Sequence, residues 1–205
     1  AQPCRYQYVL VEEKRPGEYF PIGEDAGGAF ILNSRDMCMI DHVPELMDAG
    51  LDSLKIEGRA KSAYYAAIVT AAYRHAIDAA RAGEPLDPVW RAEVDKVSHR
   101  PYSTGFYYGE PGQHTAHARY LRDWQVVGVV TSCAPDGAAL CELRNKFAEG
   151  DELELVGPGS FRAEGLTDGD GLPILEARKP QMPFRLRLPV QAPPLSLLRR
   201  KAVGL

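Results

Sequence analysis

Apolar residues recur at helical spacing between residues 62 and 82. Five of them form one stripe, at intervals of four, four, three and four: Tyr65, Val69, Tyr73, Ala76 and Ala80. Gly83 follows the stripe, and glycine commonly ends helices. The pattern predicts a long helix over residues 62–82, with its tyrosines in the core. A shorter helix is predicted over 42–49, ending at Gly50.

Between these two helices, apolar and charged residues alternate from 54 to 59. Side chains change face at every residue of a strand, so this segment would present a charged face made of Lys55, Glu57 and Arg59. The order helix, strand, helix is typical of a parallel sheet. Two interpretations stay open: an exposed edge strand, or the mouth of a barrel, where functional side chains follow the strands.

Two features upstream are less distinct. The apolar run 29–32 reads as a second strand, and Ser34 as the N-cap of a turn through Asp36 and Met37. Two strands of a βαβ array are too few to close a barrel.

The second half of the chain is rich in short β-like runs. They are separated by Pro-Asp-Gly, Gly-Pro-Gly and Asp-Gly-Asp-Gly turns and cover residues 125–131, 138–143, 152–156, 173–177 and 184–190. The Asp168–Gly171 turn lacks the later glutamate of a calcium loop. A Pro- and Gly-rich connection with one short helix (89–97) precedes these runs. We therefore expect two domains, residues 1–117 (α/β) and 118–205 (a small β-barrel or sandwich).

Charge is distributed unevenly. The net charge of −4 argues against an extended nucleic-acid surface, yet residues 171–205 hold seven basic residues against one acid, which gives +6 there and −10 over residues 1–170. Arg185 and Arg187 share one strand face, with Lys179 close before them. We call these three residues the basic strip. It suits either phosphate-backbone contact or a solubilising rim without a ligand.

Composition predicts an ordinary globular protein. Apolar residues make up 45% and charged residues 25% of the chain, and no window resembles a membrane span, so a cytoplasmic protein is the default expectation. The four cysteines (Cys4, Cys38, Cys133 and Cys141) form no C-x-x-C pair, and their spacing alone predicts no metal. Cys133 and Cys141 flank the turn at 135–137 and could face each other across a hairpin, but we expect buried free thiols.

Several motifs together resemble the collagenase-like peptidase family U-32. They are Ala1–Arg5, Glu12–Asp25, Asn33–Ile40, Ser53–Arg59 and, at the exit from the catalytic domain, His99–Phe106. The resemblance is strong over about residues 1–115 and is closest to the branch that hydroxylates tRNA uridine with prephenate. It implies the C-terminal part of a TIM-like barrel followed by a small β-barrel domain.

The resemblance also implies a cofactor. Members that bind an iron-sulfur (4Fe-4S) cluster place a ligand cysteine at the position of Cys38, and Cys4 is a weaker candidate. In that branch another cysteine directly precedes the segment that begins at Ala1. Because this chain starts without Met, we expect a C-terminal fragment that lacks most of its barrel, holds no cluster and is inactive alone.

Three functional hypotheses follow. In the first, the intact protein modifies tRNA: Glu57 acts as acid/base or orients substrate, Lys55 and Arg59 hold an anion such as prephenate, and the basic strip contacts the tRNA. The second is a collagenase-like protease, although no H-E-x-x-H or G-x-S-x-G motif is present and Cys38 with His42 is a weak nucleophile pair. The third is an RNA- or partner-binding module.

Overall fold

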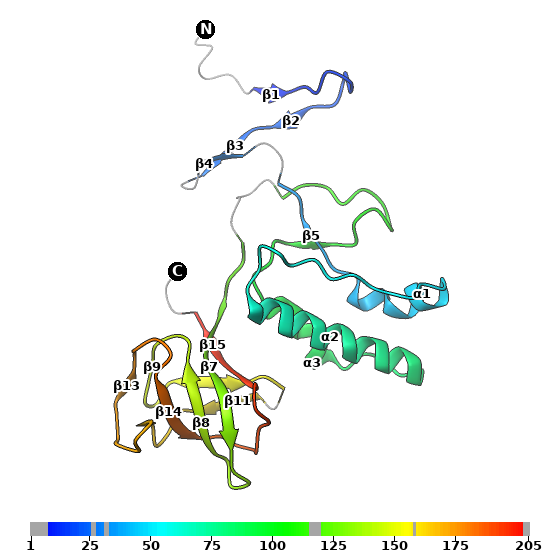
Figure 1. The fold of residues 1–205 in the computed structure, drawn as a ribbon. Helices are drawn as coiled ribbons and strands as arrows, with labels where there is room; N and C mark the ends of the chain where they lie inside the picture. Colours follow the sequence, from blue (N-terminus) through cyan, green and yellow to red (C-terminus); the bar gives the residue numbers. More distant parts are fainter. Residues whose placement is uncertain (1–7, 26–27, 31–32, 115–119, 158, 203–205) are drawn as a thin grey trace. The chain divides into compact units, whose positions relative to one another are not determined.

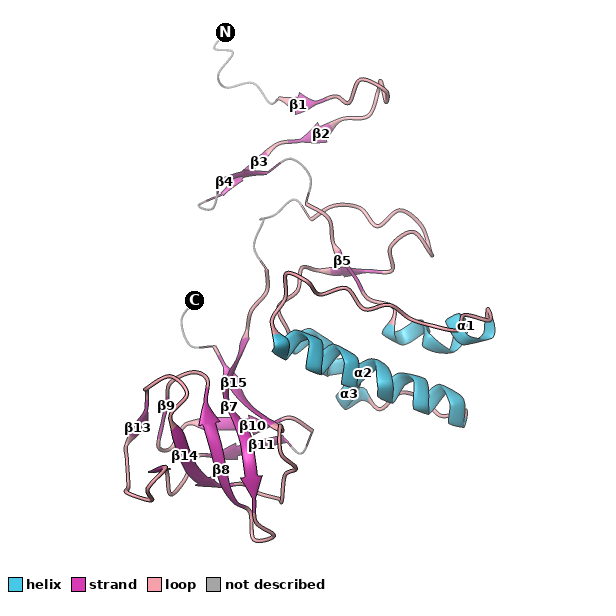
Figure 2. Cartoon of the chain, in the orientation of Figure 1, coloured by secondary structure: helices cyan, strands magenta, loops and turns pink. Residues whose placement is uncertain are grey.

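A computed structural model describes residues 8–25, 28–30, 33–114, 120–157 and 159–202 of the chain. The chain divides into two compact units, residues 1–121 and 122–205, which we call unit 1 and the β-domain. The division falls four residues after the boundary expected from composition. Figures 1 and 2 show that helices occur in unit 1, whereas the β-domain is built of strands.

Unit 1 contains the predicted helices. Their bounds are η2 (Ile40–His42), α1 (Val43–Asp48), α2 (Ala63–Ala82), α3 (Pro88–Glu93) and η3 (Val94–Lys96). At the start of α2, the Ser62 hydroxyl accepts a hydrogen bond from the Tyr65 backbone N–H at 3.2 Å. At its end, Gly83 adopts a left-handed conformation (φ 70°). The long helix therefore begins within one residue of the predicted start and ends at the glycine that the sequence indicated.

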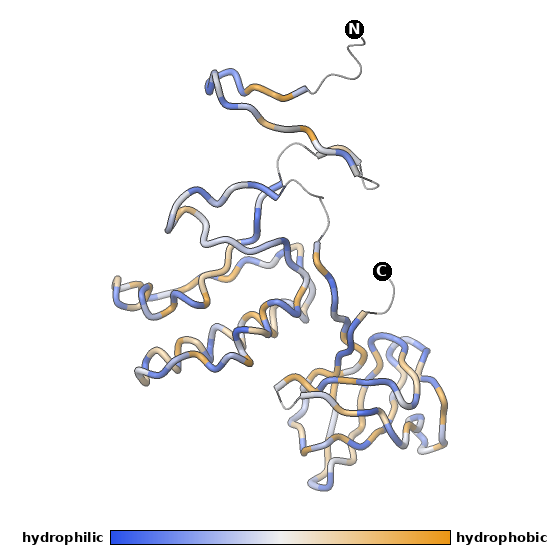
Figure 3. The backbone as a smooth tube through the Cα atoms, turned by 180° about the vertical axis from the view of Figure 1, so that it is seen from behind, coloured by the Kyte–Doolittle hydropathy of each residue, from blue (hydrophilic) through white to orange (hydrophobic). Residues whose placement is uncertain are grey.

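The helices of unit 1 pack around a small apolar core. Its buried members are Ile40, Val43, Ala72, Ala76 and Val94. The stripe predicted on α2 does face inward, since Val69 and Ala76 are buried while Tyr65 and Tyr73 are half-buried. Figure 3 shows hydrophobic and hydrophilic positions interchanging along these helices, as expected for elements with one buried face.

In the described part of unit 1, the strands are short and form three pairs. Two pairs are antiparallel, β1 (Val9–Leu10) with β2 (Phe20–Pro21) and β3 (Gly23–Asp25) with β4 (Gly28–Phe30). The third is parallel, β5 (Asp36–Met37) with β6 (Tyr102–Ser103). The turn predicted through Asp36 and Met37 was wrong, because this segment pairs with a distant strand. The run 29–32 forms a hairpin strand as far as residue 30; residues 31–32 lie outside the described residues.

The strand predicted over residues 54–59 was also wrong. Residues 51–58 have neither helical nor ladder hydrogen bonding. Alternation creates two faces, but a strand also needs a hydrogen-bonded neighbour, and the described part of unit 1 places none beside this segment. The three strand pairs do not close a barrel within the described residues.

The β-domain is a curled antiparallel sheet of seven strands, in the order β11-β10-β15-β7-β8-β14-β12. The strands are β7 (Trp124–Cys133), β8 (Ala138–Leu143), β10 (Glu152–Leu155), β11 (Gly159–Arg162), β12 (Thr167–Asp168), β14 (Pro183–Arg187) and β15 (Leu197–Lys201). A smaller pair joins β9 (Phe147–Ala148) to β13 (Glu176–Ala177). The edge strands β11 and β12 are not paired with each other in the described residues, so the sheet is a half-barrel.

The concave side of this sheet holds the second core. It is a single cluster of apolar side chains that includes Val127, Val130, Phe147, Leu153, Phe184 and Leu198. Strand β14 shows the predicted alternation, with Phe184 and Leu186 buried and both arginines exposed. The Asp168 carboxylate accepts backbone N–H bonds from residues 170 and 172, which confirms a tight turn there. Cys133 and Cys141 are free thiols as expected, but only Cys141 is buried, since Cys133 is partly exposed.

Among the described residues, no helix has both the length and the hydropathy needed to cross a bilayer.

Candidate functional site

Unit 1 contains a pocket of about 710 Å³ with a cationic lining. Five basic side chains contribute to it against two carboxylates: Arg35, Lys55, Arg59, Lys61 and Arg100, with Asp36 and Glu57. Four tyrosines add aromatic surface: Tyr65, Tyr73, Tyr107 and Tyr120. The excess of positive charge favours anionic or phosphate-bearing ligands. We call this hollow the cationic pocket.

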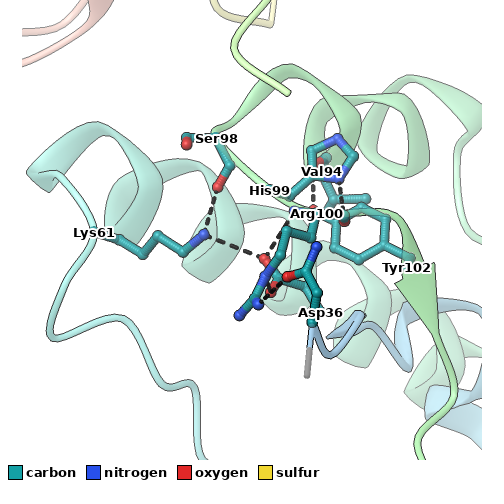
Figure 4. Close-up of polar contacts among 8 residues, drawn as sticks. Asp36, Lys61, Val94, Ser98, His99, Arg100 and Tyr102 are labelled. Atoms are coloured by element: carbon teal, nitrogen blue, oxygen red, sulfur yellow. Dashed lines mark hydrogen bonds and ion pairs between the residues drawn. The ribbon is translucent and has the colours of Figure 1, made fainter. Parts of the chain in front are cut away.

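One wall of the cationic pocket is an ion-pair network centred on Asp36 (Figure 4). One carboxylate oxygen of Asp36 accepts from Lys61 Nζ at 3.2 Å and from the Arg100 backbone N–H at 3.1 Å, and the other accepts from Arg100 Nε at 3.3 Å. Arg100 also donates to Asn33 Oδ1 at 2.9 Å. The three charged side chains are only 15–23% exposed, so this network is better shielded from solvent than a surface ion pair.

Backbone pairing brings these distant residues together. The parallel pairing of β5 with β6 fixes Asp36 beside Tyr102, and the Asp36 backbone N–H donates to the Pro101 carbonyl at 3.2 Å. His99 Nδ1 lies 2.8 Å from the Arg100 carbonyl oxygen, and the His99 ring stacks on Tyr102 at a centroid distance of 4.2 Å. These contacts immobilise the backbone on both sides of Arg100.

Lys61 spans the network and the aromatic wall. Its ammonium group donates to the Ser98 carbonyl at 2.8 Å and lies 3.9 Å from the centroid of the Tyr120 ring. The Arg100 guanidinium lies 5.2 Å from the same ring. Two cations against one aromatic ring constitute a favourable cation–π arrangement. Burial raises the pKa of Tyr65, which also contacts Lys61, so this phenol stays protonated.

The three charged residues predicted from alternation do line the cationic pocket, but they are exposed. Glu57 accepts from the Arg59 backbone N–H at 2.9 Å and from its Nε at 3.2 Å. These hydrogen bonds, with the nearby Lys55 charge, lower the pKa of Glu57. A carboxylate with a lowered pKa is a weak proton acceptor near neutral pH, so its position suits orienting Arg59. Within the described residues, Lys55 has no hydrogen bond or ion pair and is available to a ligand.

Cys38 lies next to this pocket, half-buried against the core of unit 1. Its sulfur is 3.9 Å from the Tyr73 hydroxyl, and burial raises the pKa of the thiol. His42, the weak candidate for a nucleophile pair, instead contacts Glu45 at 3.0 Å through Nδ1 and packs against Tyr108. Among the described residues, no group of three or more potential ligands could hold a metal ion. Cys4 lies outside the described residues.

In the β-domain, ion pairs within the domain reduce the predicted positive charge. Arg199 is fully buried and bonded to Glu154 at 2.6 Å, and Arg200 pairs with Asp151. Of the basic strip, Arg187 pairs with Asp136 at 3.2 Å, whereas the Arg185 side chain donates to the Gly169 carbonyl and has no ion pair within the described residues. Lys179 is exposed in the loop before β14.

Sequence reasoning missed the most strongly bonded residues of the site. Asp36 is 25 residues from Lys61 and 64 residues from Arg100 in the sequence, so no local pattern connects them. A signal was nevertheless present, because Asp36 and Arg100 fall inside two of the motifs that carried the family resemblance.

Two family models cover nearly the whole chain. The model for peptidase family U32 matches residues 1–117, and that for the peptidase family U32 C-terminal domain matches residues 122–199. The chain belongs to peptidase family U32. This confirms the resemblance on which the sequence analysis relied.

Relatives within the U32 family carry two kinds of name. The tRNA hydroxylation protein P of Escherichia coli (strain K12) is 38% identical over 181 residues, which are 84% of this chain and 40% of that protein. The tRNA hydroxylation protein P1 of Bacillus subtilis (strain 168) is 31% identical over 97% of this chain and 50% of its own length. A collagenase of Porphyromonas gingivalis is 32% identical over 54% of this chain and 26% of that protein.

The chain spans 40–50% of the length of the two tRNA hydroxylation proteins. Among solved structures, the C-terminal domain of a Geobacillus thermoleovorans U32 peptidase covers 37% of this chain, at 28% sequence identity and a TM-score of 0.36.

Proposed function

We propose that the intact protein modifies tRNA by prephenate-dependent 5-hydroxylation of uridine, and that this chain contributes part of its catalytic domain together with its β-domain. The observation that supports this most directly is the similarity to tRNA hydroxylation proteins, which extends over both units. The proposal includes a TIM-like barrel for the complete catalytic domain and a cytoplasmic location, where tRNA is found.

The cationic pocket would hold the small anionic co-substrate. Lys55 is an exposed cation of the lining with no hydrogen bond or ion pair among the described residues, and Arg59 is oriented by Glu57. Carboxylates of prephenate would be bound by these two side chains through charge-assisted hydrogen bonds. Behind them, the Asp36 network keeps Lys61 and Arg100 in fixed positions. We therefore assign Glu57 an orienting role rather than proton transfer.

An iron-sulfur cluster remains part of this proposal through Cys38. The described residues provide one thiol at that place and not a ligand set, so a cluster requires further cysteines from outside the described ranges. If bound, it would supply electron transfer, as iron-sulfur clusters do. The Cys38 sulfur lies beside the Tyr73 hydroxyl. The same hydroxyl accepts a hydrogen bond from the Met39 backbone N–H at 2.8 Å, which holds the backbone next to Cys38 in place.

The test uses a strain that lacks the full-length gene. We expect its tRNA to lose 5-hydroxyuridine, measured by nucleoside mass spectrometry, and to regain it when the wild-type gene is returned. Lys55→Gln should restore much less, whereas Lys14→Gln, which removes an exposed lysine outside the pocket, should restore it fully. Unchanged 5-hydroxyuridine in the deletion strain would contradict the proposal.

The cluster is tested separately on full-length protein purified without oxygen. We expect iron and sulfide together with visible absorption, and loss of both in Cys38→Ala. A colourless protein free of iron would remove the cluster from the proposal. The tRNA assay would then still test the modification activity.

A collagenase-like protease is the second candidate, favoured by the relative that bears that name. The described residues offer little support for a cysteine nucleophile, because His42 contacts Glu45 and Tyr108 rather than Cys38. Gelatin cleavage by the full-length protein that is abolished in Glu57→Gln would support this candidate.

A further inference from the structure

The β-domain has an open groove of about 740 Å³ that is lined by residues of strands β11, β14 and β8. One wall comes from the edge strand β11, with Phe161 and Arg162. The opposite wall comes from β14, with Arg185 and Arg187, and continues into the residues that follow it. Figure 2 shows β14 beside β8, whose first residues also line the groove. The groove therefore gathers arginines from strands that are far apart in the sequence.

The arginines of the groove are incompletely neutralised. The Arg162 side chain is exposed and has no hydrogen bond or ion pair within the described residues, and Glu152 is its cross-strand neighbour on β10. Arg185 donates from Nε to the Gly169 carbonyl at 3.2 Å, so its two terminal amino groups can still donate to a ligand. Arg187 pairs with Asp136, but both side chains are more than half exposed, and such pairs contribute little and exchange readily. Glu164 is the second acid of the lining.

The lining also has an apolar component. Phe161 is half-buried and packs against the core, while Leu186 and Leu188 are buried beneath the arginines. Leu186 and Leu188 are each only 3% exposed, so the half-buried Phe161 provides the aromatic surface that a ligand can reach. Together with the guanidinium groups, it suits a ligand that joins charged parts to flat apolar parts. Single-stranded RNA has this character, because each nucleotide joins a phosphate to a base that can stack.

We propose that this groove binds a single-stranded segment of RNA, with phosphates on Arg162 and Arg185 and a base against Phe161. The inference rests on the proposed tRNA function and deepens it by naming the contact surface. Guanidinium groups match phosphate geometry through paired N–H donors. Arg187 becomes a third contact when phosphate replaces Asp136. Of the basic strip, Arg185 and Arg187 line the groove and Lys179 does not. Arg178 also lies outside the lining.

The experiment measures binding of the full chain to a short fluorescein-labelled oligouridine by anisotropy, over a salt series. We expect Arg162→Gln and Arg185→Gln each to weaken binding several-fold and to lower the salt dependence by about 0.7 in log K against log salt, the value for one lost phosphate contact on a single strand. The matched control is Arg178→Gln, an exposed arginine of the same domain outside the groove, which should bind as the wild type does.

Three results would overturn the proposal. The first is equal weakening by Arg178→Gln, which would indicate diffuse attraction. The second is absence of binding at low salt. The third is binding of labelled polyglutamate with the same dependence on Arg162 and Arg185, which would indicate an acidic peptide as the ligand.

Failure here is distinguishable from failure of the proposed function. A deletion strain that loses 5-hydroxyuridine, combined with groove variants that bind oligouridine normally, would reject the groove and keep the modification. Unchanged tRNA in the deletion strain, combined with oligouridine binding that depends on Arg162 and Arg185, would reject the modification and keep the groove.

Discussion

The substitution Asp36→Asn tests the ion-pair network of unit 1. It keeps the size of the side chain but removes the negative charge that faces Lys61 and Arg100. Removing one partner of a fully buried pair costs about 3–5 kcal/mol, and an exposed pair contributes about 0–1 kcal/mol. With 15–23% exposure, this network is close to the buried limit. We expect the free energy of unfolding of unit 1 to fall by about 2–4 kcal/mol.

Urea unfolding followed by tryptophan fluorescence measures this loss. Trp90 in α3 stacks on His75 at 3.9 Å and reports on unit 1, so the measurement is made in a Trp124→Phe background, which silences the β-domain. The matched control is Asp78→Asn, which breaks an exposed ion pair between Asp78 and Arg74 on α2.

We expect the control to change stability by no more than about 0.5 kcal/mol. If Asp36→Asn and Asp78→Asn destabilised unit 1 equally, shielding of the network would not matter, and our reasoning about the site would be wrong.

Three further predictions use the same unfolding assay. Ser62→Ala removes the N-cap of α2 and should destabilise unit 1 by about 1 kcal/mol. Gly137→Ala should destabilise the β-domain by about 1–3 kcal/mol more than Gly150→Ala, since both glycines have positive φ but only at 137 would the new Cβ lie 2.4 Å from the Leu188 carbonyl oxygen. Trp124 reports on this domain in a Trp90→Phe background. Burial raises the pKa of Cys141 from 9.0 to about 12, so the folded thiol keeps a proton that the unfolded chain releases. Stability of the β-domain should therefore fall as the pH rises from about 9 to about 12, and it should fall less in Cys141→Ala.

Local signals predicted the helices because the relevant interactions are local. The stripe on α2, its Ser62 cap and its terminal Gly83 all act within a few residues of each other. The segment 54–59 shows the limit of such reasoning, since its alternation describes two faces but not the neighbour that a strand requires.

Strand β15 was missed for a related reason. Its sequence Leu-Leu-Arg-Arg-Lys does not alternate, and its register against β7 shifts between Leu198 and Arg199. At this irregularity both residues are buried, and Arg199 is tolerated there because Glu154 on the adjacent strand accepts its Nε hydrogen bond. Neither the shift nor the partner is visible from neighbouring residues.

The candidate site likewise contains residues that the local sequence pattern predicted and residues that it did not. Lys55, Glu57 and Arg59 were found because they are adjacent in sequence, and they line the cationic pocket. The Asp36 network needed the pairing of β5 with β6, which joins segments more than sixty residues apart. The roles of the predicted residues in catalysis stay predictions until the tRNA assay is made.

The position of β15 has a consequence for how the β-domain assembles during synthesis. It is the last strand of the sheet along the chain, yet it lies between β10 and β7 and joins the β10–β11 pair to the remaining strands. Until β15 has been made, the nascent chain can form two separate sheet fragments but no continuous sheet. Folding of this domain must therefore await its final strand, and the open edges of β7 and β10 are available for wrong pairing until then.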